Sequence, residues 1–135
     1  MTPRSRDLLG AWAPPAAWAL LIFVGSSFPA RTGRILFHGA DKVLHVVEYG
    51  MLGYLSARAF RRTLPAWPRA RLLLATALLA VAYGTTDECH QSFVPEREME
   101  WGDLAADAAG GLAGAALFVG MMGRRTALSA PPRSP

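Results

Sequence analysis

The chain has 135 residues, of which 52% are hydrophobic and 18% charged, and it carries four more positive than negative charges. This length allows one domain and leaves no room for a separate catalytic lobe. The single cysteine, Cys89, excludes an internal disulfide framework and an all-cysteine zinc site. The basic residues stand at the ends of apolar runs and not in one folded patch, which argues against nucleic acid as a partner and favours a membrane.

The first apolar run extends over 23 residues, Leu8 to Ala30, without a charged side chain. Because a helix rises about 1.5 Å per residue, this run exceeds the ~30 Å hydrocarbon core of a bilayer. The pair Pro14-Pro15 predicts a kink within it. A cleaved signal peptide is the alternative, but the bulky Phe28 makes a cut after Ala30 unfavourable, so an anchoring helix is expected.

Three shorter apolar runs follow, each about 15 or 16 residues long. Runs of this length match either buried core helices or membrane spans whose polar flanking residues belong to the helix. In the second case the flanking charges lie at the rim of the apolar slab. We predict an all-α fold, an integral membrane bundle of four transmembrane helices, at about 8–29, 41–60, 70–90 and 103–122.

A soluble four-helix bundle is the main alternative, and it requires a polar face on every helix. The segments 16–24 (AAWALLIFV) and 72–81 (LLLATALLAV) have no such face. We therefore assign residues 1–126 to one membrane domain. Residues 127–135 are rich in proline and serine, and they are expected to form a disordered tail.

The charged residues divide unequally between the two ends of the predicted bundle. The N-terminus, the connection between the second and third helices and the segment after the fourth helix carry ten basic residues and one acid. The two remaining connections and the adjoining helix ends carry four basic residues and nine acids. Because cytoplasmic loops are enriched in Lys and Arg, both termini are predicted to face the cytoplasm. The acidic end then faces outward from the inner (cytoplasmic) membrane.

Polar residues recur on one face of the helix expected at 41–60. Spacings of three and four residues place them on a single helical stripe. The members of this stripe are Asp41, His45, Glu48, Tyr49 and Leu52. Two of them have simpler explanations as well, since Asp41 can be a helix N-cap and Tyr49 an interfacial aromatic residue.

The next two helices carry stripes of the same kind. On the third helix the residues that share or adjoin one face are Tyr83, Gly84, Asp87, Glu88 and Gln91. On the fourth helix the aligned residues are Asp103, Asp107, Gly110 and Gly114. Its two glycines form a small-xxx-small pair, which lets helix backbones approach closely. The acids of the fourth helix are therefore expected to point into the bundle, although Asp103 also stands where an N-cap belongs.

Several acids gathered inside a membrane need an explanation. One acid at the centre of a span costs roughly 3 kcal/mol, and less near the rim, so a group must pair, take up protons or bind something. We therefore expect a functional site at the outer end of the bundle. Its candidate catalytic residues are His45, Glu48, Asp87 and Glu88. Its candidate ligand-binding residues are Asp41, Lys42, Tyr49, His90, Gln91, Arg97, Asp103 and Asp107.

Two segments carry a specific signature. The first is Asp41-Lys42-x-x-His45-x-x-Glu48-Tyr49-x-x-Leu52-Gly53, and the second is Asp87-Glu88-x-His90-Gln91-x-Phe93-Val94-Pro95-x-Arg97, followed by Asp103 and Gly110. Together they resemble the VanZ-like family, named for a protein associated with teicoplanin resistance, over roughly residues 15–120. The resemblance implies a small multi-pass membrane protein and implies no reaction. The chain departs from the family pattern with Glu96 in place of Gly and Asp107 in place of Asn, which changes charge and hydrogen-bond donation.

Three functions remain open. Slightly favoured is a protein that binds a cell-envelope lipid-linked or cell-wall-related group and so affects sensitivity to teicoplanin. The second is an intramembrane hydrolase or transferase with Glu48 or Glu88 as general base and His45 or His90 as acid. The third is a purely structural lock between helices. The cofactor stays open, because His45, Glu48, Asp87 and Glu88 suit zinc or manganese but form no linear metal motif. The expected partners are the lipid bilayer and an envelope lipid or cell-wall precursor, with no nucleic acid.

Overall fold

The computed structural model describes residues 3–29 and 39–128. Its helices are α1 (Pro3–Ser26), α2 (Ala40–Thr63), α3 (Arg69–Gln91) and α4 (Trp101–Leu128), and no strand occurs among the described residues. The all-α prediction with four helices is confirmed. Of the predicted tail, residues 129–135 lie outside the described part of the chain, as do Arg31 and Arg34 of the first outer connection.

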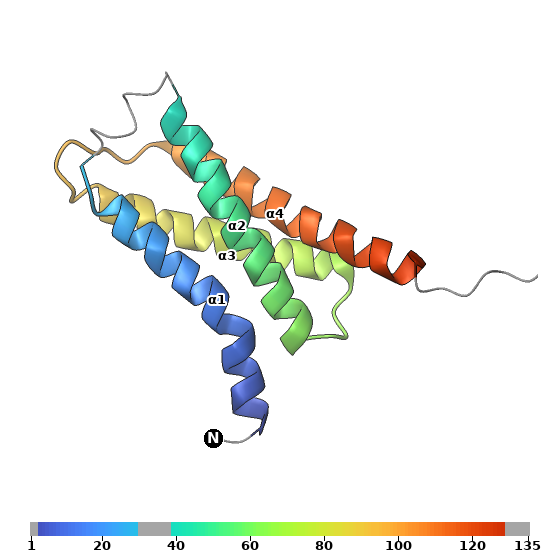
Figure 1. The fold of residues 1–135 in the computed structure, drawn as a ribbon. Helices are drawn as coiled ribbons and strands as arrows, with labels where there is room; N and C mark the ends of the chain where they lie inside the picture. Colours follow the sequence, from blue (N-terminus) through green and yellow to red (C-terminus); the bar gives the residue numbers. More distant parts are fainter. Residues whose placement is uncertain (1–2, 30–38, 129–135) are drawn as a thin grey trace, which may run out of the picture.

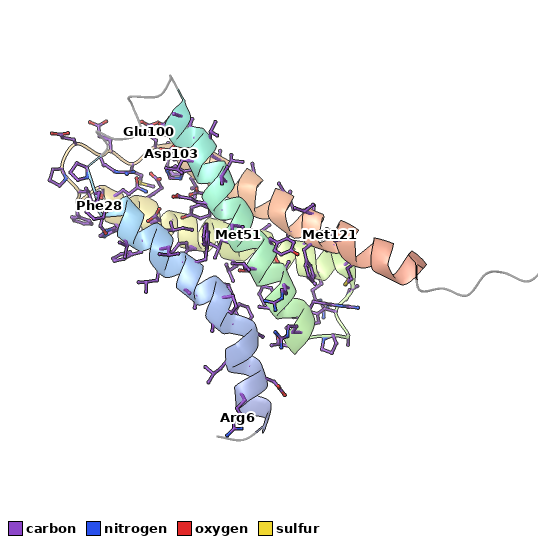
Figure 2. The ribbon with its side chains drawn as sticks, viewed as in Figure 1. Arg6, Phe28, Met51, Glu100, Asp103 and Met121 are labelled. Carbon is purple, nitrogen blue, oxygen red and sulfur yellow. The ribbon has the colours of Figure 1, made fainter. Side chains whose placement is uncertain are left out.

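Successive helices run in opposite directions (Figure 1). The end of α1, the start of α2, the end of α3 and the start of α4 therefore gather at one end of the molecule, which we call the acidic end. Figure 2 shows Glu100 and Asp103 there, with Arg6 at the opposite end. For the residues that the structure describes, the charge division seen in the sequence thus corresponds to two separate ends of the bundle.

Three of the described helices, α1, α3 and α4, contain segments long and apolar enough to cross a membrane. α2 has the same length as α1, 24 residues, but six of its residues are charged, so its length and composition alone do not identify it as a span. Its exposed charged residues lie only near its two ends, however, and the exposed residues between them are apolar. Val43, Leu44 and Val47 are more than half exposed, whereas His45 and Tyr49 are buried. α2 thus turns apolar side chains outward and polar ones inward, as a membrane helix does.

Glycines set the contact between α2 and α4. A Cβ atom added to Gly110 would lie 2.5 Å from the Val46 carbonyl oxygen, and one added to Gly114 would overlap the backbone of Gly50. A Cβ on Gly53 of α2 would likewise overlap Gly111 of α4. The predicted role of Gly110 and Gly114 is confirmed. Because the two backbones touch, short side chains at the acidic end can reach from one helix to the other.

α1 lies against α2 and α3 through a few directed contacts. The Trp18 indole donates a hydrogen bond to the Glu48 carbonyl oxygen at 2.8 Å, and the Tyr83 hydroxyl donates one to the Ala19 carbonyl oxygen at 2.5 Å. The helix continues through Pro14 and Pro15, and it bends in its N-terminal half (Figure 1). Each proline lacks an amide N–H, which agrees with the predicted kink.

Candidate functional site

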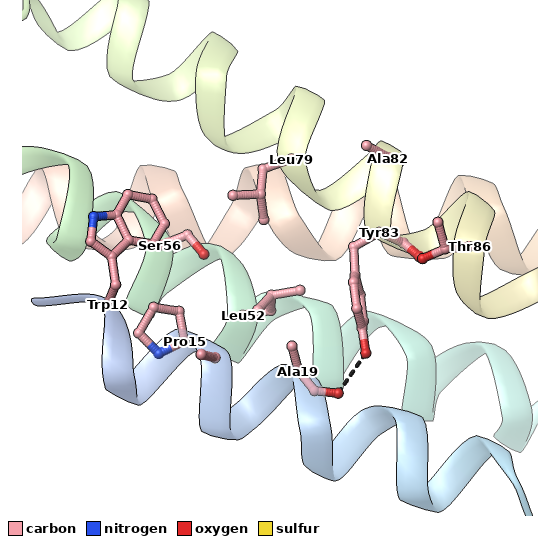
Figure 3. Close-up of a pocket in the computed structure, with 10 residues that line it drawn as sticks. Trp12, Pro15, Ala19, Leu52, Ser56, Leu79, Ala82, Tyr83 and Thr86 are labelled. Atoms are coloured by element: carbon pink, nitrogen blue, oxygen red, sulfur yellow. Dashed lines mark hydrogen bonds between the residues drawn. The ribbon is translucent and has the colours of Figure 1, made fainter. Parts of the chain in front are cut away.

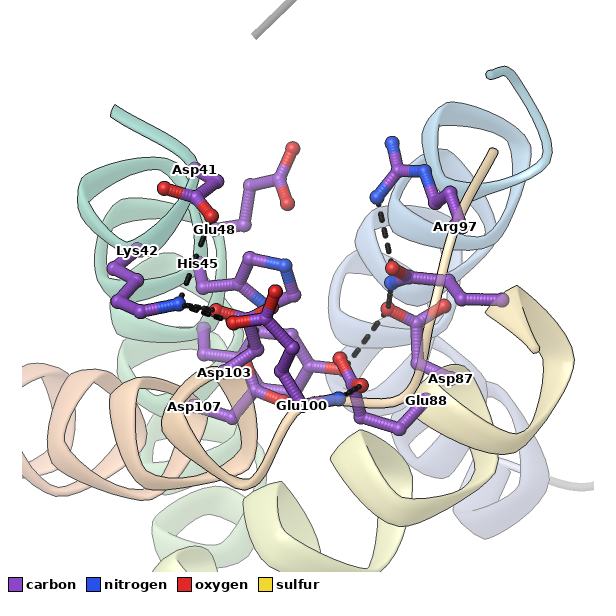
Figure 4. A network of polar contacts seen from close by, with 12 residues as sticks. Asp41, Lys42, His45, Glu48, Asp87, Glu88, Arg97, Glu100, Asp103 and Asp107 are labelled. Carbon is purple, nitrogen blue, oxygen red and sulfur yellow. Dashed lines mark hydrogen bonds and ion pairs between the residues drawn. The ribbon is translucent and has the colours of Figure 1, made fainter. Parts of the chain in front are cut away.

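Six polar side chains meet between α2, α3 and α4 at the acidic end (Figure 4). We call them the buried cluster, and its members are His45, Tyr49, Asp87, Glu88, Gln91 and Asp107. None is more than 6% exposed. Its shortest contact between helices joins His45 Nδ1 of α2 to Asp107 Oδ1 of α4 at 2.8 Å. The expectation that the acids of the fourth helix point into the bundle is confirmed, and the stripes on α2 and α3 contribute buried members as well.

Local packing explains how Asp107 fits into this space. A Cβ atom on Gly84 of α3 would lie only 2.5 Å from Asp107 Oδ2, so the absence of a side chain at Gly84 makes room for the carboxylate. On the α2 side, the rings of His45 and Tyr49 stack one helical turn apart, with centroids separated by 6.2 Å. The carboxylate of Asp107 is thus enclosed by α3 on one side and by the imidazole of His45 on the other.

A chain of hydrogen bonds orients Asp87. Arg97 Nη1 donates to Gln91 Oε1 at 2.8 Å, and Gln91 Nε2 donates to Asp87 Oδ2 at 3.0 Å. The Tyr49 hydroxyl donates to the same carboxylate oxygen at 3.5 Å. Arg97 also donates from Nε to the carbonyl oxygen of Phe28 at 3.1 Å. The guanidinium therefore acts on Asp87 through Gln91, and it ties the loop before α4 to the chain after α1.

A second group surrounds Lys42 at the rim of the bundle. Lys42 Nζ lies 2.8 Å from Glu100, 2.9 Å from Asp103 and 3.6 Å from Asp41. We call these four residues the Lys42 group. The Asp103 side chain is only 10% exposed, whereas those of Asp41 and Glu100 are about half exposed. Three rim acids share this ammonium, which joins the first turns of α2 and α4.

The N-cap explanation for the two aspartates is wrong. The residue at the N-cap of α2 is Gly39, with no side-chain capping bond, and Asp41 lies in the first turn. Asp103 likewise lies in the first turn of α4. Negative charge is favourable there because of the positive end of the helix dipole. Lys42 adds the specific partner that both acids share.

Three buried carboxylate oxygens have no hydrogen-bond partner among the described residues: Asp87 Oδ1, Glu88 Oε1 and Asp107 Oδ2. The second oxygen of Glu88 accepts a hydrogen bond from the backbone N–H of Glu100 at 2.9 Å. A buried carboxylate oxygen loses its hydration and normally regains a donor or a cation in exchange. The buried cluster therefore has free capacity for a proton, a cation or the donors of a ligand.

The remaining candidates lie outside the buried cluster. The Glu48 side chain is half-buried, and it makes no hydrogen bond or ion pair with the other residues drawn in Figure 4. His90 packs against α1, where its ring lies 4.4 Å from that of Phe23 and its Nε2 lies 3.0 Å from Ser27 Oγ.

Tyr49, by contrast, belongs to the buried cluster. It is fully buried, so the interfacial alternative for it is wrong.

Two residues of the site were not among the predicted candidates. Glu100 reaches Lys42 with its carboxylate and Glu88 with its backbone N–H. Its spacing of three residues from Asp103 is the sequence signal for the first contact. Gly84 was placed next to the stripe on the third helix, but its contact is with Asp107, 23 residues further along the chain. No pattern within a single helix predicts such a contact between two helices.

A cavity of about 450 Å³ opens between α1, α2 and α3 (Figure 3). Its lining is mostly apolar and includes Trp12, Leu52 and Leu79. Tyr83 also lines it, and the ring of Tyr83 lies 6.1 Å from that of Tyr49, centroid to centroid. Asp87 follows Tyr83 by one helical turn. The apolar cavity thus ends close to the buried cluster.

No curated protein and no solved structure matches the chain. A protein-family model described as VanZ/LLP1 matches residues 12–123. This match includes the whole buried cluster, the Lys42 group and the residues that line the cavity. It also includes both segments whose spacing carried the resemblance. The chain therefore belongs to the VanZ-like family.

Proposed function

We propose that this protein binds an amphiphile of the cell envelope, a lipid-linked or cell-wall-related molecule. The observation that carries the proposal is that the apolar cavity lies next to the buried cluster, where Tyr83 of the cavity wall lies beside Tyr49 of the cluster. A hydrocarbon chain in the cavity would place an attached polar group next to Asp87. Binding sites commonly combine an apolar lining with a few convergent polar groups in this way.

The polar end offers partners for a hydrophilic headgroup. The free oxygens of Asp87 and Glu88 can accept hydrogen bonds from hydroxyl or ammonium groups. Arg97 and Lys42 flank the cluster and supply the cationic donors that phosphate or carboxylate groups favour. A headgroup that contains both hydroxyl and anionic parts, as envelope precursors do, matches this set.

The proposal includes four spans and a fixed orientation in the cytoplasmic membrane. α2 serves as the fourth span, which its apolar outer face supports. Excess positive charge at the opposite end supports cytoplasmic termini, and the buried cluster then opens outward. A protein that withdraws or presents a cell-wall precursor at that surface would change the sensitivity of a cell to teicoplanin indirectly.

Lipid photo-crosslinking tests whether the hydrocarbon part of the amphiphile binds in the cavity. The protein is placed in nanodiscs with a lipid analogue whose hydrocarbon chain carries a diazirine. Ala82 of α3 is exposed and lines the cavity, and Ala82→Phe is expected to lower the cross-linked fraction at least about fivefold by filling space. Ala109→Phe, at an exposed alanine of α4 that does not line this cavity, is the matched control. Equal labelling of both variants would contradict the proposed position of the hydrocarbon chain in the cavity.

Asp87→Asn tests the headgroup and separates binding from a structural lock. Under the binding proposal this variant accumulates as folded protein but loses any effect of the native protein on teicoplanin sensitivity. Glu98→Gln, an exposed acid of the outer loop, is the matched control. A proportional fall in folded protein, measured by size-exclusion chromatography, would instead assign Asp87 to the structural lock.

A hydrolase or transferase is the second candidate. The observation that favours it is the 2.8 Å contact between His45 and Asp107, because a carboxylate on one imidazole nitrogen orients the ring for acid/base chemistry. Glu88, with one unpartnered oxygen, is then a candidate general base. Conversion of an envelope lipid by the native protein, and its loss in His45→Gln, would favour this alternative over simple binding.

A further inference from the structure

We propose that the buried cluster holds a divalent metal ion, Zn²⁺ or Mn²⁺, between His45, Glu88 and Asp107. These residues come from α2, α3 and α4, and one ligand atom from each lies within 4.8 Å of the other two. Donors bound to one ion at ~2.1 Å are at most about 4.2 Å apart, so small side-chain shifts complete the site. The residues that the sequence suggested as metal ligands were His45, Glu48, Asp87 and Glu88, and they did not include Asp107.

Unpartnered oxygens on two of the three residues provide the independent observation. Glu88 Oε1 and Asp107 Oδ2 have no partner among the described residues, and both residues are 0% exposed. In Figure 4 the Glu88 carboxylate extends from α3 toward α2 and α4. Its other oxygen is held by the Glu100 N–H, an outer contact of the kind that orients metal ligands.

The protein's own nearest cations are engaged elsewhere. Lys42 bonds to the rim acids Glu100 and Asp103, and Arg97 bonds to Gln91 and to a backbone carbonyl group. Three further acids, Asp41, Glu100 and Asp103, also lie close enough together to bind an ion. Lys42 places an ammonium beside all three of these acids, whereas no Lys or Arg side chain among the described residues bonds to Glu88 or Asp107.

The donor set indicates which ion fits. One imidazole nitrogen with two carboxylates suits Zn²⁺ or Mn²⁺, whereas Ca²⁺ and Mg²⁺ prefer oxygen ligands throughout. Three protein ligands leave coordination positions for water or for an oxygen of a bound molecule. Asp107 stands where the resemblance to the family leads one to expect Asn. Its negative charge therefore gives this chain a stronger cation site than a neutral amide would.

Metal analysis of the full-length protein tests the inference. The protein is purified in detergent without chelators, its Zn and Mn contents are measured by mass spectrometry, and Co²⁺ is then titrated while its visible absorption is recorded. We expect about one equivalent of metal per chain. Glu88→Gln and Asp107→Asn should each weaken Co²⁺ binding by about tenfold or more. Asp41→Asn, in the acid group occupied by Lys42, is the matched control and should bind Co²⁺ as the native protein does.

Three results would overturn the assignment. The first is less than about one-tenth equivalent of metal together with no Co²⁺ spectrum, which means that protons neutralise the acids. The second is weakened binding in Asp41→Asn alone, which places the ion in the Lys42 group. The third is native affinity in Asp107→Asn, the variant that restores the family's amide and is expected to fold. Metal is counted on delipidated protein, so failure here leaves amphiphile binding untouched, and a failed lipid cross-link leaves the metal site untouched.

Discussion

At the scale of single residues, Lys42 holds together acids from two parts of the chain. Its ammonium serves Glu100 and Asp103 at once, and these acids come from the loop before α4 and from its first turn. Asp103 is nearly buried, so its charge has little water to stabilise it when the ammonium is removed. The exposed partners depend on Lys42 much less.

Lys42→Met keeps the length of the side chain and removes its charge. We expect the variant to be less stable by about 1–2 kcal/mol, between the values for exposed and buried pairs, because Asp103 loses its counterion. The measurement is thermal unfolding in detergent, with Lys42→Arg as the control that keeps the charge. The double variant Lys42→Met/Asp103→Asn should recover most of the loss. A double variant as unstable as the single one would show that Lys42 acts through packing and not through charge.

At the scale of helices, the contact between α2 and α4 determines which side chains meet. The two backbones lie so close together that a Cβ atom added to Gly53, Gly110 or Gly114 would overlap backbone atoms of the other helix. The same register places Lys42 beside Asp103 and His45 beside Asp107. Separating the helices would therefore weaken both pairs together.

Gly114→Ala tests this dependence. The new methyl group would overlap the Gly50 carbonyl group, so we expect a loss of about 1–3 kcal/mol in unfolding free energy, measured by denaturation in mixed micelles. Gly120→Ala in the same helix is the control, because a Cβ there meets nothing within 4 Å. That variant should be neutral or more stable by up to about 1 kcal/mol, the helix propensity difference. Equal stabilities for the two variants would contradict a tight crossing.

The sequence allowed the four helices, the polar stripes on three of them and the inward direction of the α4 acids to be predicted, because these follow from patterns within one helix. His45 and Tyr49 on α2 and Asp107 on α4 are buried as their spacing indicates. Pairings between helices were not predictable in the same way. His90 has the spacing of a site residue, but the aromatic ring of Phe23 holds it against α1. Which helix a residue faces depends on crossing angles that no local pattern encodes.

At the scale of the whole molecule, the separation of acidic and basic ends predicts an orientation that can be measured. In a Cys89→Ser background, single cysteines are placed at Glu98 and, separately, at Arg62, both of which are exposed. A membrane-impermeant thiol reagent applied to intact cells should label position 98 and not position 62, whereas lysed cells should show labelling at both. The reverse pattern would place the buried cluster on the cytoplasmic side and redirect the search for a ligand to cytoplasmic molecules.

The pairing of His45 with Asp107 also has a consequence for biosynthesis. The two residues are 62 positions apart, so at ~5–20 residues per second the ribosome makes Asp107 roughly 3–12 s after His45. During that interval α2 carries Lys42 and His45 without their partners on α4. In the proposed topology α2 therefore enters the membrane late, together with α4. A nascent chain that ends after α3 should leave α2 accessible to added protease, and extension through α4 should protect it.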